Sequence, residues 1–368
     1  MRDRKEGVSM NITMNLLRRI GSPFVPEQKQ TLPENKREAQ ELYAHATKNK
    51  IGLLYLESLK NQEKIEEFGL ESEYREESEK HEQQVITAIR VAKLLNSFDV
   101  NYVVFKSFMP YSAVPNDVDI VHLGSEEGYK KVEEMMVQAG YIQFFGIGKT
   151  ESQVMFHDSR GGDHLGGHEK DIYDIDIYRM IAASHIIYLD KKKFVKYVTE
   201  MTVSDVQVKV LEPEAELVAI ITHSIIPEQL CTLSVYYAML HYLAKMNHKY
   251  VDKFVHIVEE NDVIFLTRAH CSLVAELHQA AHGFVPEKLN EVLIKLGGEV
   301  QEKRYLIETN FKMPHLYSRY TIIRALLEKT KEKTFRKSVI RQGLSMLNPM
   351  FANWVISEVI RRRRRETY

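Results

Sequence analysis

Alternation of polar and apolar residues marks two short stretches in the middle of the chain. Residues 117–123 read DVDIVHL, and residues 172–178 read IYDIDIY. A β-strand sends successive side chains to opposite faces, so the acids of each stretch share one face and the apolar residues share the other. Runs of β-branched and aromatic residues predict further strands at residues 100–108, 141–147, 153–157 and 205–211.

Helical periodicity dominates both sides of these strands. Apolar residues recur at helical spacing between Val85 and Leu95 and predict a helix at residues 83–96. Residues 36–60 also read as helical, whereas the strongly charged residues 61–82 read either as a solvated helix or as a linker. Further helices are predicted at residues 125–139, 214–226, 233–246, 250–260, 266–280, 286–296, 317–329 and 349–365.

The length of the chain indicates more than one structural unit. It has 368 residues, which is more than a single core usually holds. We expect an α/β (α+β) core at residues 97–212, between an N-terminal helical segment at 36–96 and a C-terminal all-α domain at 213–348. Residues 1–35, with three prolines, are expected to form a loosely ordered polar lead-in. Residues 349–368 are expected to form an amphipathic helix with a polybasic tail.

Charge is balanced over the whole chain but not along it. The net charge of −1 gives no reason to expect a nucleic-acid-binding protein. Residues 331–368, by contrast, hold ten Lys or Arg residues and three Glu residues, a surplus of seven positive charges. Two interpretations of this tail stay open. It is a docked helix with a free charged end, or Arg361–Arg365 contact an anionic surface such as a membrane or phosphates.

Cysteine usage and hydropathy restrict the class of protein. Cys231 and Cys271 lie far apart and lack CxxC spacing, so neither a disulfide framework nor a zinc knuckle is expected. No apolar run approaches the ~20 residues of a membrane-spanning helix, and the N-terminus lacks the apolar segment of a signal peptide. We therefore expect a protein without a transmembrane segment that works in the reducing cytoplasm.

Four aspartates carry the chemistry that the sequence suggests. Asp117 and Asp119 share one face of their strand, and Asp174 and Asp176 share one face of theirs. Carboxylates gathered on one sheet face repel each other unless a cation lies between them or some take up protons. Oxygen ligands of this kind suit Mg²⁺ or Mn²⁺, which also bind the phosphates of a substrate.

A phosphate-binding turn is expected near these acids. Lys106 and Ser107 end the first predicted strand, shortly before Asp117. A helix beginning at about Phe108 would direct free N–H groups and its positive dipole end toward the site. Lys106 would add its charge and Ser107 its hydroxyl, so both are candidate nucleotide-binding residues.

The order of these motifs resembles a known family. Several segments match it: VVFKS (103–107), NDVDIVH (116–122), YDIDIY (173–178), LEPEAELVAIITHS (211–224) and ELYAHATKNKIGLLYLESL (41–59). They are similar to the uncharacterised Lys-Gly-type nucleotidyltransferases of the DNA polymerase β-type nucleotidyltransferase superfamily. The resemblance covers roughly residues 36–290. Ser107 stands in place of the family's Gly, Tyr178 in place of a His, and an Arg often found before the DxD is absent.

This resemblance implies a fold and an activity. It implies a mixed β-sheet with flanking helices, Mg²⁺ or Mn²⁺, and transfer of a nucleoside monophosphate from an NTP, expected to be ATP, to an acceptor hydroxyl. Asp117, Asp119 and Asp176 would be the metal ligands and catalytic residues, and Asp174 and His223 are candidate additional site residues. The acceptor is a small molecule, a protein or an RNA. The alternative is a degenerate nucleotidyltransferase-fold module that senses nucleotides or binds proteins.

A histidine, a set of tyrosines and a Gly/His-rich stretch each have two possible interpretations. His223 lies on an apolar helix and is either a core histidine or a residue that reaches the active-site cleft. The tyrosines Tyr236, Tyr237 and Tyr242 have helical spacing and either pack in the core or stack on a base. The Gly- and His-rich stretch at residues 157–168 is either a solvated loop over the site or a transition-metal site.

Overall fold

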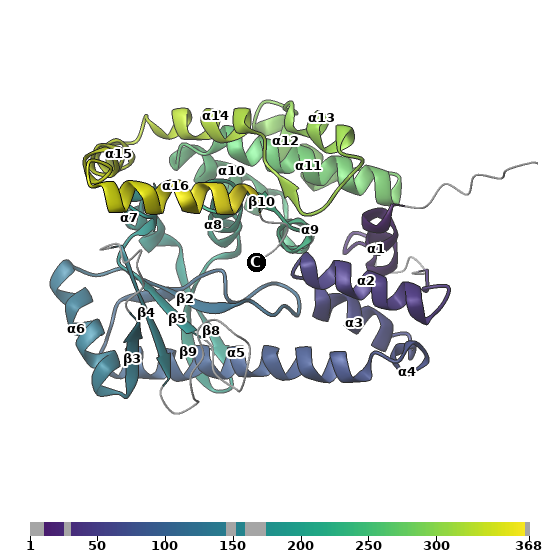
Figure 1. The fold of residues 1–368 in the computed structure, drawn as a ribbon, viewed down its shortest axis with the longest axis horizontal. Helices are drawn as coiled ribbons and strands as arrows, with labels where there is room; N and C mark the ends of the chain where they lie inside the picture. Colours follow the sequence, from purple (N-terminus) through teal and green to yellow (C-terminus); the bar gives the residue numbers. More distant parts are fainter. Residues whose placement is uncertain (1–10, 26–30, 145–151, 159–173, 365–368) are drawn as a thin grey trace, which may run out of the picture.

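A computed structural model describes residues 11–25, 31–144, 152–158 and 174–364 (Figure 1). The Gly/His-rich stretch lies outside these ranges except for its first two residues. The helices are α1 (Ile12–Ile20), α2 (Lys36–Lys48), α3 (Gly52–Lys60), α4 (Ile65–Phe68), α5 (Glu71–Ser97), α6 (Glu126–Gln138), α7 (Lys191–Phe194), α8 (Pro213–Ile225), α9 (Leu233–Lys245), α10 (His248–Glu260), α11 (Ile264–His282), α12 (Glu287–Lys295), α13 (Glu302–Glu308), α14 (Arg319–Lys329), α15 (Lys333–Ser345) and α16 (Pro349–Arg364), with a 3-10 turn at Val195–Tyr197.

The strands form one large sheet and two small ones. They are β1 (Tyr102–Val104), β2 (Asp117–His122), β3 (Tyr141–Phe144), β4 (Gln153–Asp158), β5 (Asp174–Tyr178), β6 (Ile181–Ala183), β7 (Ile186–Leu189), β8 (Val198–Val203), β9 (Val206–Leu211), β10 (Leu230–Cys231) and β11 (His315–Leu316). The large sheet has seven strands in the order β3-β4-β5-β2-β1-β9-β8. It is mixed, because β2–β5 and β1–β9 are parallel while the other neighbouring pairs are antiparallel. The predicted α/β class with a mixed sheet is confirmed.

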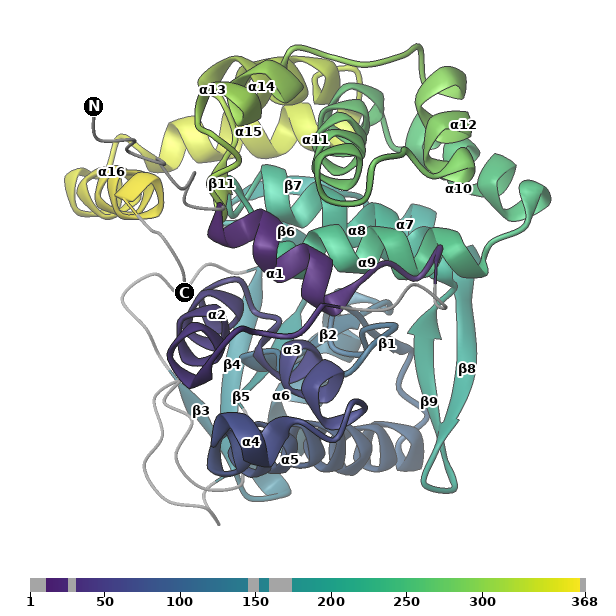
Figure 2. The same ribbon diagram turned by 90° about the vertical axis from the view of Figure 1, so that its right-hand side faces the viewer.

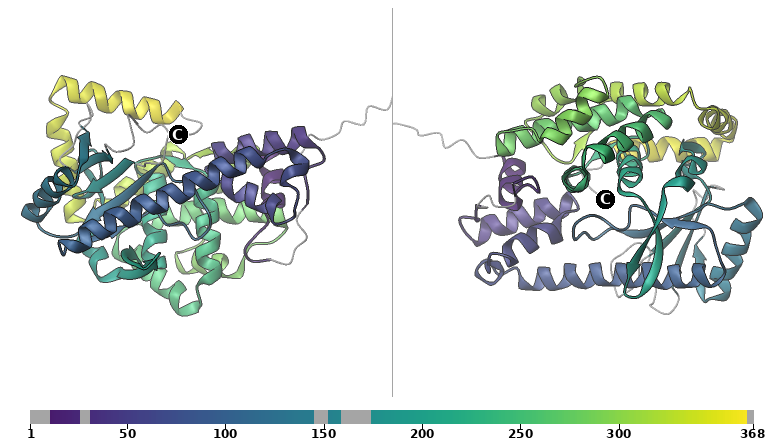
Figure 3. Two further views of the ribbon diagram at one scale, coloured as in Figure 1. Left: turned by 90° about the horizontal axis from the view of Figure 1, so that it is seen from below. Right: turned by 180° about the vertical axis from the view of Figure 1, so that it is seen from behind.

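One face of the large sheet is covered by α5 and α6. Val118, Ile120, Ile175 and Ile177 from the central strands are all buried in a cluster with apolar residues of these two helices. In the view from below, α5 runs along the length of the molecule (Figure 3). This helix includes most of the charged stretch that the sequence left open between helix and linker.

The opposite side of the sheet packs against helices from both ends of the chain. Val103, Phe105 and Tyr178 belong to a second cluster, which also contains apolar residues of α1, α2, α3, α8, α9 and α11. Figure 2 shows α1 to α3 between α5 on one side and the C-terminal helices on the other, and α1 contacts α11. The N-terminal and C-terminal helices therefore share one core.

The structure corrects two of the predicted segments. The polar lead-in contains α1, whose Leu16 and Leu17 are fully buried; Asn11 caps this helix by accepting from the N–H groups of Thr13 and Met14. The short run ITMNLLRRI, with its apolar residues among polar ones, did not stand out in the polar lead-in. The C-terminal domain is not all-α, because β10 and β11 pair inside it.

The hairpin β6–β7, strand β8 and helices α13 and α15 were also not predicted. No helix in the described part of the chain is long and apolar enough to cross a membrane.

Candidate active site

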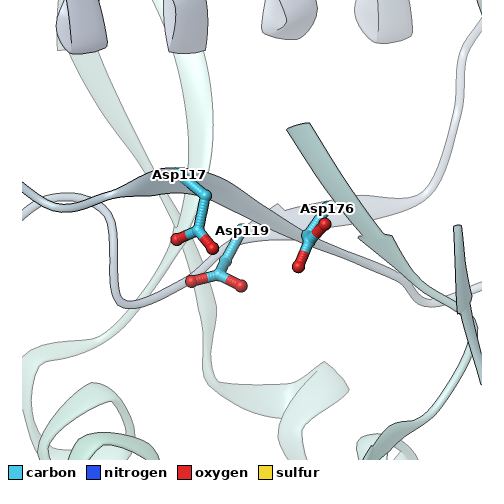
Figure 4. A group of neighbouring side chains, drawn as sticks. All are labelled: Asp117, Asp119 and Asp176. Atoms are coloured by element: carbon cyan, nitrogen blue, oxygen red, sulfur yellow. The ribbon is translucent and has the colours of Figure 1, made fainter. Parts of the chain in front are cut away.

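Three aspartates meet where β2 and β5 run side by side. The two strands are parallel, with Asp117 opposite Asp174 and Asp119 opposite Asp176. Carboxylate oxygens of Asp117, Asp119 and Asp176 all lie within 4.8 Å of one another (Figure 4). Asp174 is next to Asp117 in the register but is not part of this group. The strand register therefore makes one compact cluster from two sequence motifs.

Alternation along the strands fixes the direction of these side chains. Val118 and Ile120 on β2, and Ile175 and Ile177 on β5, are buried against α5 and α6. A shift of one residue in either strand would place acids in that core, at a prohibitive desolvation cost. The apolar residues between the aspartates thus hold the acids on the opposite face, as the sequence pattern predicts.

The cluster is buried and incompletely hydrogen-bonded. Asp119 and Asp176 are 4% and 5% exposed, and the Oδ1 atom of each has no hydrogen-bond partner among the described residues. Oδ2 of Asp176 accepts from Nε2 of Gln153 at 3.1 Å and from the hydroxyl of Tyr178 at 3.5 Å. A buried carboxylate oxygen without a partner is costly. Together with the carboxylate of Asp117, these two groups supply the hard oxygen donors that fit Mg²⁺ or Mn²⁺.

The acids also strain one another electrostatically. Burial and then the charge of Asp119 raise the pKa of Asp117 to about 7, although Lys106 and Lys50 act in the opposite direction. Burial and the charges of Asp117 and Asp119 raise the pKa of Asp176 well above its ordinary range. A cation would relieve this repulsion, whereas without one Asp117 takes up a proton near neutral pH.

Lys106 supplies a positive charge next to the cluster. Its backbone has a φ of +58°, and its Nζ lies 3.1 Å from Oδ2 of Asp119. Its N–H donates to Oε1 of the buried Glu216 at 2.5 Å. Burial alone would lower the pKa of Lys106, but the carboxylate of Asp119 and other acidic groups raise it above its ordinary value. Lys106 is therefore a charged ammonium held inside the protein.

Ser107 has a different place from the one expected. It is buried, its Oγ accepts from the N–H of Asp119 at 2.9 Å, and it donates to the carbonyl of Phe105 at 3.2 Å. No helix begins at Phe108, because residues 105–116, all of them described, form turns and irregular chain. The expected helix N-terminus at the site is therefore wrong, and the Ser107 hydroxyl ties the turn to β2 instead of facing the cavity.

His223 reaches the same site from α8. Its Nδ1 lies 2.8 Å from the hydroxyl of Tyr188, and both ring nitrogens lie 3.4 Å from Nζ of Lys106. Its Nε2 lies 3.3 Å from Oε1 of Glu228. Burial and then the charge of Lys106 lower the pKa of His223, so the ring is neutral at pH 7. Of the two interpretations left open by the sequence, the structure shows the one in which His223 faces the cleft.

The cluster opens onto a cavity of about 550 Å³. Its walls come from four separate parts of the chain: the strands and their connections, the α2–α3 turn, the α8–α9 region and the C-terminal helix α16. Lining residues that were not predicted as part of this site include Lys50, Gln153, Glu228, Trp354 and Glu358, and Arg361 of the basic tail joins them. Only the folded chain brings these distant segments together.

The three tyrosines of α9 belong to the core. Tyr236 and Tyr237 are fully buried, with their rings edge to face and centroids 5.0 Å apart, and Tyr242 is also buried. None of the three lines the cavity. The packing interpretation of this stretch is the one that the structure supports.

Comparisons with known proteins give little beyond this geometry. No protein-family model and no curated protein matches the chain. Among solved structures, it is similar to an antigenic nucleotidyltransferase-like protein from Paracoccidioides brasiliensis, with 11% sequence identity and a TM-score of 0.30. That match covers 48% of this chain and 88% of the other. A similarity at this level does not establish a shared fold.

Proposed function

We propose that the protein is a metal-dependent nucleotidyltransferase that moves a nucleoside monophosphate from an NTP to an acceptor hydroxyl. One observation carries the proposal: Asp117, Asp119 and Asp176 bring carboxylate oxygens within 4.8 Å of one another on adjacent parallel strands. Two of these buried carboxylates keep an oxygen without a partner, and the group opens onto a cavity of about 550 Å³. A cavity of this volume is in the range that holds a small organic ligand.

The three aspartates would hold Mg²⁺ or Mn²⁺, which when bound would neutralise phosphate charge and polarise the reacting oxygens. The chain's own residues then have separate tasks. Lys106, beside Asp119, is positioned to bind a phosphate oxygen. His223, held by Tyr188 and Glu228, keeps a neutral ring against Lys106 and limits where its ammonium can move.

The proposed reaction forms one bond and breaks one bond at the α-phosphorus. The acceptor oxygen forms a bond to the α-phosphorus, and the bond from that phosphorus to the bridging oxygen breaks. Pyrophosphate leaves with the electron pair, and the hydroxyl proton passes to Asp176. Most of the acceleration in phosphoryl transfer comes from positioning and charge stabilisation, which buried, fixed groups supply well.

A second candidate function rests on the ion pair between Lys106 and Asp119. Their separation of 3.1 Å means that one carboxylate of the cluster already has an internal counter-ion. A degenerate module, which binds a nucleotide without catalysing its transfer, would need only a carboxylate cluster that is partly neutralised in this way. The two candidates differ in turnover, not in nucleotide binding.

The decisive experiment is incubation with Mg²⁺, α-labelled NTPs and a cell extract. We expect label to appear on an acceptor with release of pyrophosphate, and we expect the Asp117→Asn/Asp119→Asn variant to transfer none. Binding of NTP–Mg²⁺ by calorimetry without any transfer would favour the degenerate module. Absence of both binding and transfer would exclude a nucleotide site at this cluster.

A further inference from the structure

A second lysine enters the cavity from the N-terminal helices. Lys50 lies in the turn between α2 and α3 and lines the cavity together with Lys106 and the three aspartates. The two lysines come from different layers of the fold, one from the helices and one from the connection between β1 and β2. Lys50 lies within the segment 41–59 that resembles the nucleotidyltransferase family, but it was not predicted as a site residue.

The turn that carries Lys50 is anchored to another helix. Asn49, which is fully buried, accepts from the N–H of Leu233 through Oδ1 at 3.2 Å and from the N–H of Ser234 through its carbonyl at 3.1 Å. These N–H groups belong to the first turn of α9, whose N-cap Thr232 offers no side-chain hydrogen bond. Asn49 therefore caps α9 from outside. The backbone next to Lys50 is fixed as a result.

Lysine is an unfavourable residue for this backbone. Lys50 has a φ of +58°, a left-handed conformation that glycine or asparagine adopts at lower cost. The turn itself is closed by backbone hydrogen bonds from Lys50 to Thr47 and from Ile51 to Ala46, both 2.9 Å. None of these bonds needs a lysine side chain. Strained residues of this kind gather at ligand sites, where the side chain has a task.

The charges around the cavity indicate what that task is. Besides the three aspartates, Glu228 and Glu358 line the cavity, so a triphosphate needs cations there. Among the residues that the structure describes, the lining cations are Lys50, Lys106 and Arg361. Lys106 is ion-paired to Asp119, and Arg361 pairs with Glu358 at 2.7 Å with 61% of its side chain exposed. Lys50 is half-buried; burial lowers its pKa, and the nearby carboxylates of Glu228 and Asp117 act in the opposite direction.

We propose that Lys50 binds the β- and γ-phosphates of the NTP, the part that leaves as pyrophosphate. This inference rests on the proposed function. Transfer requires the α-phosphate to lie against the aspartate cluster, with Lys106 beside it. Lys50, which reaches the cavity from the helices and not from the strands, is then left to bind the β- and γ-phosphates. An ammonium suits this role, since it is a compact charge with three donors.

The test compares Lys50→Asn with Lys48→Gln, a lysine two residues earlier that does not line the cavity. Asparagine tolerates the left-handed backbone, so the melting temperature should not fall. Calorimetry with Mg²⁺ present measures the affinity for ATP, AMP and pyrophosphate. We expect Lys50→Asn to weaken ATP and pyrophosphate binding about tenfold, the scale of a lost charge-assisted hydrogen bond, and to leave AMP binding within about twofold. Lys50→Arg should restore part of the loss, and Lys48→Gln should change nothing.

The outcomes separate this inference from the proposed function. If the wild type binds ATP and Lys50→Asn binds it equally well, Lys50 has no phosphate role and the proposed function stands. An equal loss for ATP and AMP would mean that Lys50 shapes the whole cavity, which also overturns the inference. If the wild type binds neither ATP nor pyrophosphate, both proposals fail together.

Discussion

At the scale of single residues, the site is defined by acids whose charges are not fully compensated. Asp117, Asp119 and Asp176 lie close together, Asp119 and Asp176 are buried, and Lys106 forms its ion pair with Asp119. The sequence predicted these acids because alternation in a strand is a strong signal. It did not predict how deeply they are buried, which depends on helices elsewhere in the chain.

The first prediction concerns metal binding. Mg²⁺ or Mn²⁺ should raise the melting temperature, because a ligand of the folded state stabilises it by about 2.7 kcal/mol at a hundred times its Kd. Asp117→Asn/Asp119→Asn should remove this response in a thermal melt with and without metal. Asp174→Asn, outside the cluster, is the matched control and should keep it. A double variant that still responds like the wild type would place the metal elsewhere.

The second prediction separates the two aspartates of β5. Asp176 belongs to the cluster and Asp174 does not. Asp176→Asn should reduce turnover at least ~10²-fold, the lower end for loss of a positioned base or ligand. Asp174→Asn should cost less, when both variants are assayed at saturating Mg²⁺. The reverse ranking would show that the assigned roles of the two residues are wrong.

The third prediction concerns pH. Burial raises the pKa of Glu216 to about 8, above its ordinary value of 4.5. The folded protein therefore holds this proton more tightly than the unfolded chain, and the free energy of unfolding falls as the pH rises from 4.5 to about 8. Glu216→Gln should not show this loss. The melting temperature of the variant minus that of the wild type should therefore increase as the pH rises across that window. The exposed Glu259→Gln should follow the wild type at every pH.

At the scale of elements, helix α16 forms part of the site rather than a loose end. Trp354, Glu358 and Arg361 line the cavity, and the ring of Phe351 lies 5.3 Å from that of His185. Helix α15, which precedes it, is held to the β6–β7 hairpin by Ser338 and Gln342. Figure 1 shows α16 (yellow) running across the molecule.

The fourth prediction uses the fact that the chain has a single tryptophan. Because Trp354 lines the cavity, titration with NTP–Mg²⁺ should change the intrinsic fluorescence, with the same Kd as calorimetry gives. Trp354→Phe removes the signal and serves as the blank. Saturation in calorimetry with a flat fluorescence trace would place the nucleotide away from α16.

Elements with strong local signals were predicted, and those held by tertiary contacts were not. Strands β2 and β5 alternate clearly, and Pro213 begins α8 as a first-turn proline should. The hairpin β6–β7, by contrast, reads as an apolar run interrupted by Ser184 and His185. Its placement depends on hydrogen bonds to α15, which no window of local sequence contains.

At the scale of the whole molecule, the segments predicted as separate domains share one hydrophobic cluster. Leu17 of α1, Val103 of β1 and Leu273 of α11 all belong to it. The expected α/β class was confirmed. The division into an N-terminal segment, a core and a C-terminal domain stays a prediction, because one cluster joins all three segments while another joins the sheet to α5 and α6 alone. Apolar periodicity shows that a face is buried without showing which partner covers it.

The fifth prediction follows from this shared core. Leu17→Ala should cost about 2–5 kcal/mol of unfolding free energy, as expected for a fully buried leucine. Denaturant unfolding should remain one transition by both fluorescence and circular dichroism. Ile12→Ala, at a position that is 41% exposed on the same helix, is the control and should cost far less. Two separated transitions would show that the N-terminal helices fold apart from the rest.

The ion pair between Lys106 and Asp119 makes metal and nucleotide interdependent ligands. A cation entering the cluster alone brings a second positive charge close to the Lys106 ammonium, which lies 3.1 Å from Oδ2 of Asp119, and the two cations repel each other. A phosphate that binds Lys106 offsets this repulsion. The two ligands should therefore show positive cooperativity, and by thermodynamic linkage each raises the affinity of the other by the same factor. The empty protein is then a resting state with a low affinity for either ligand alone.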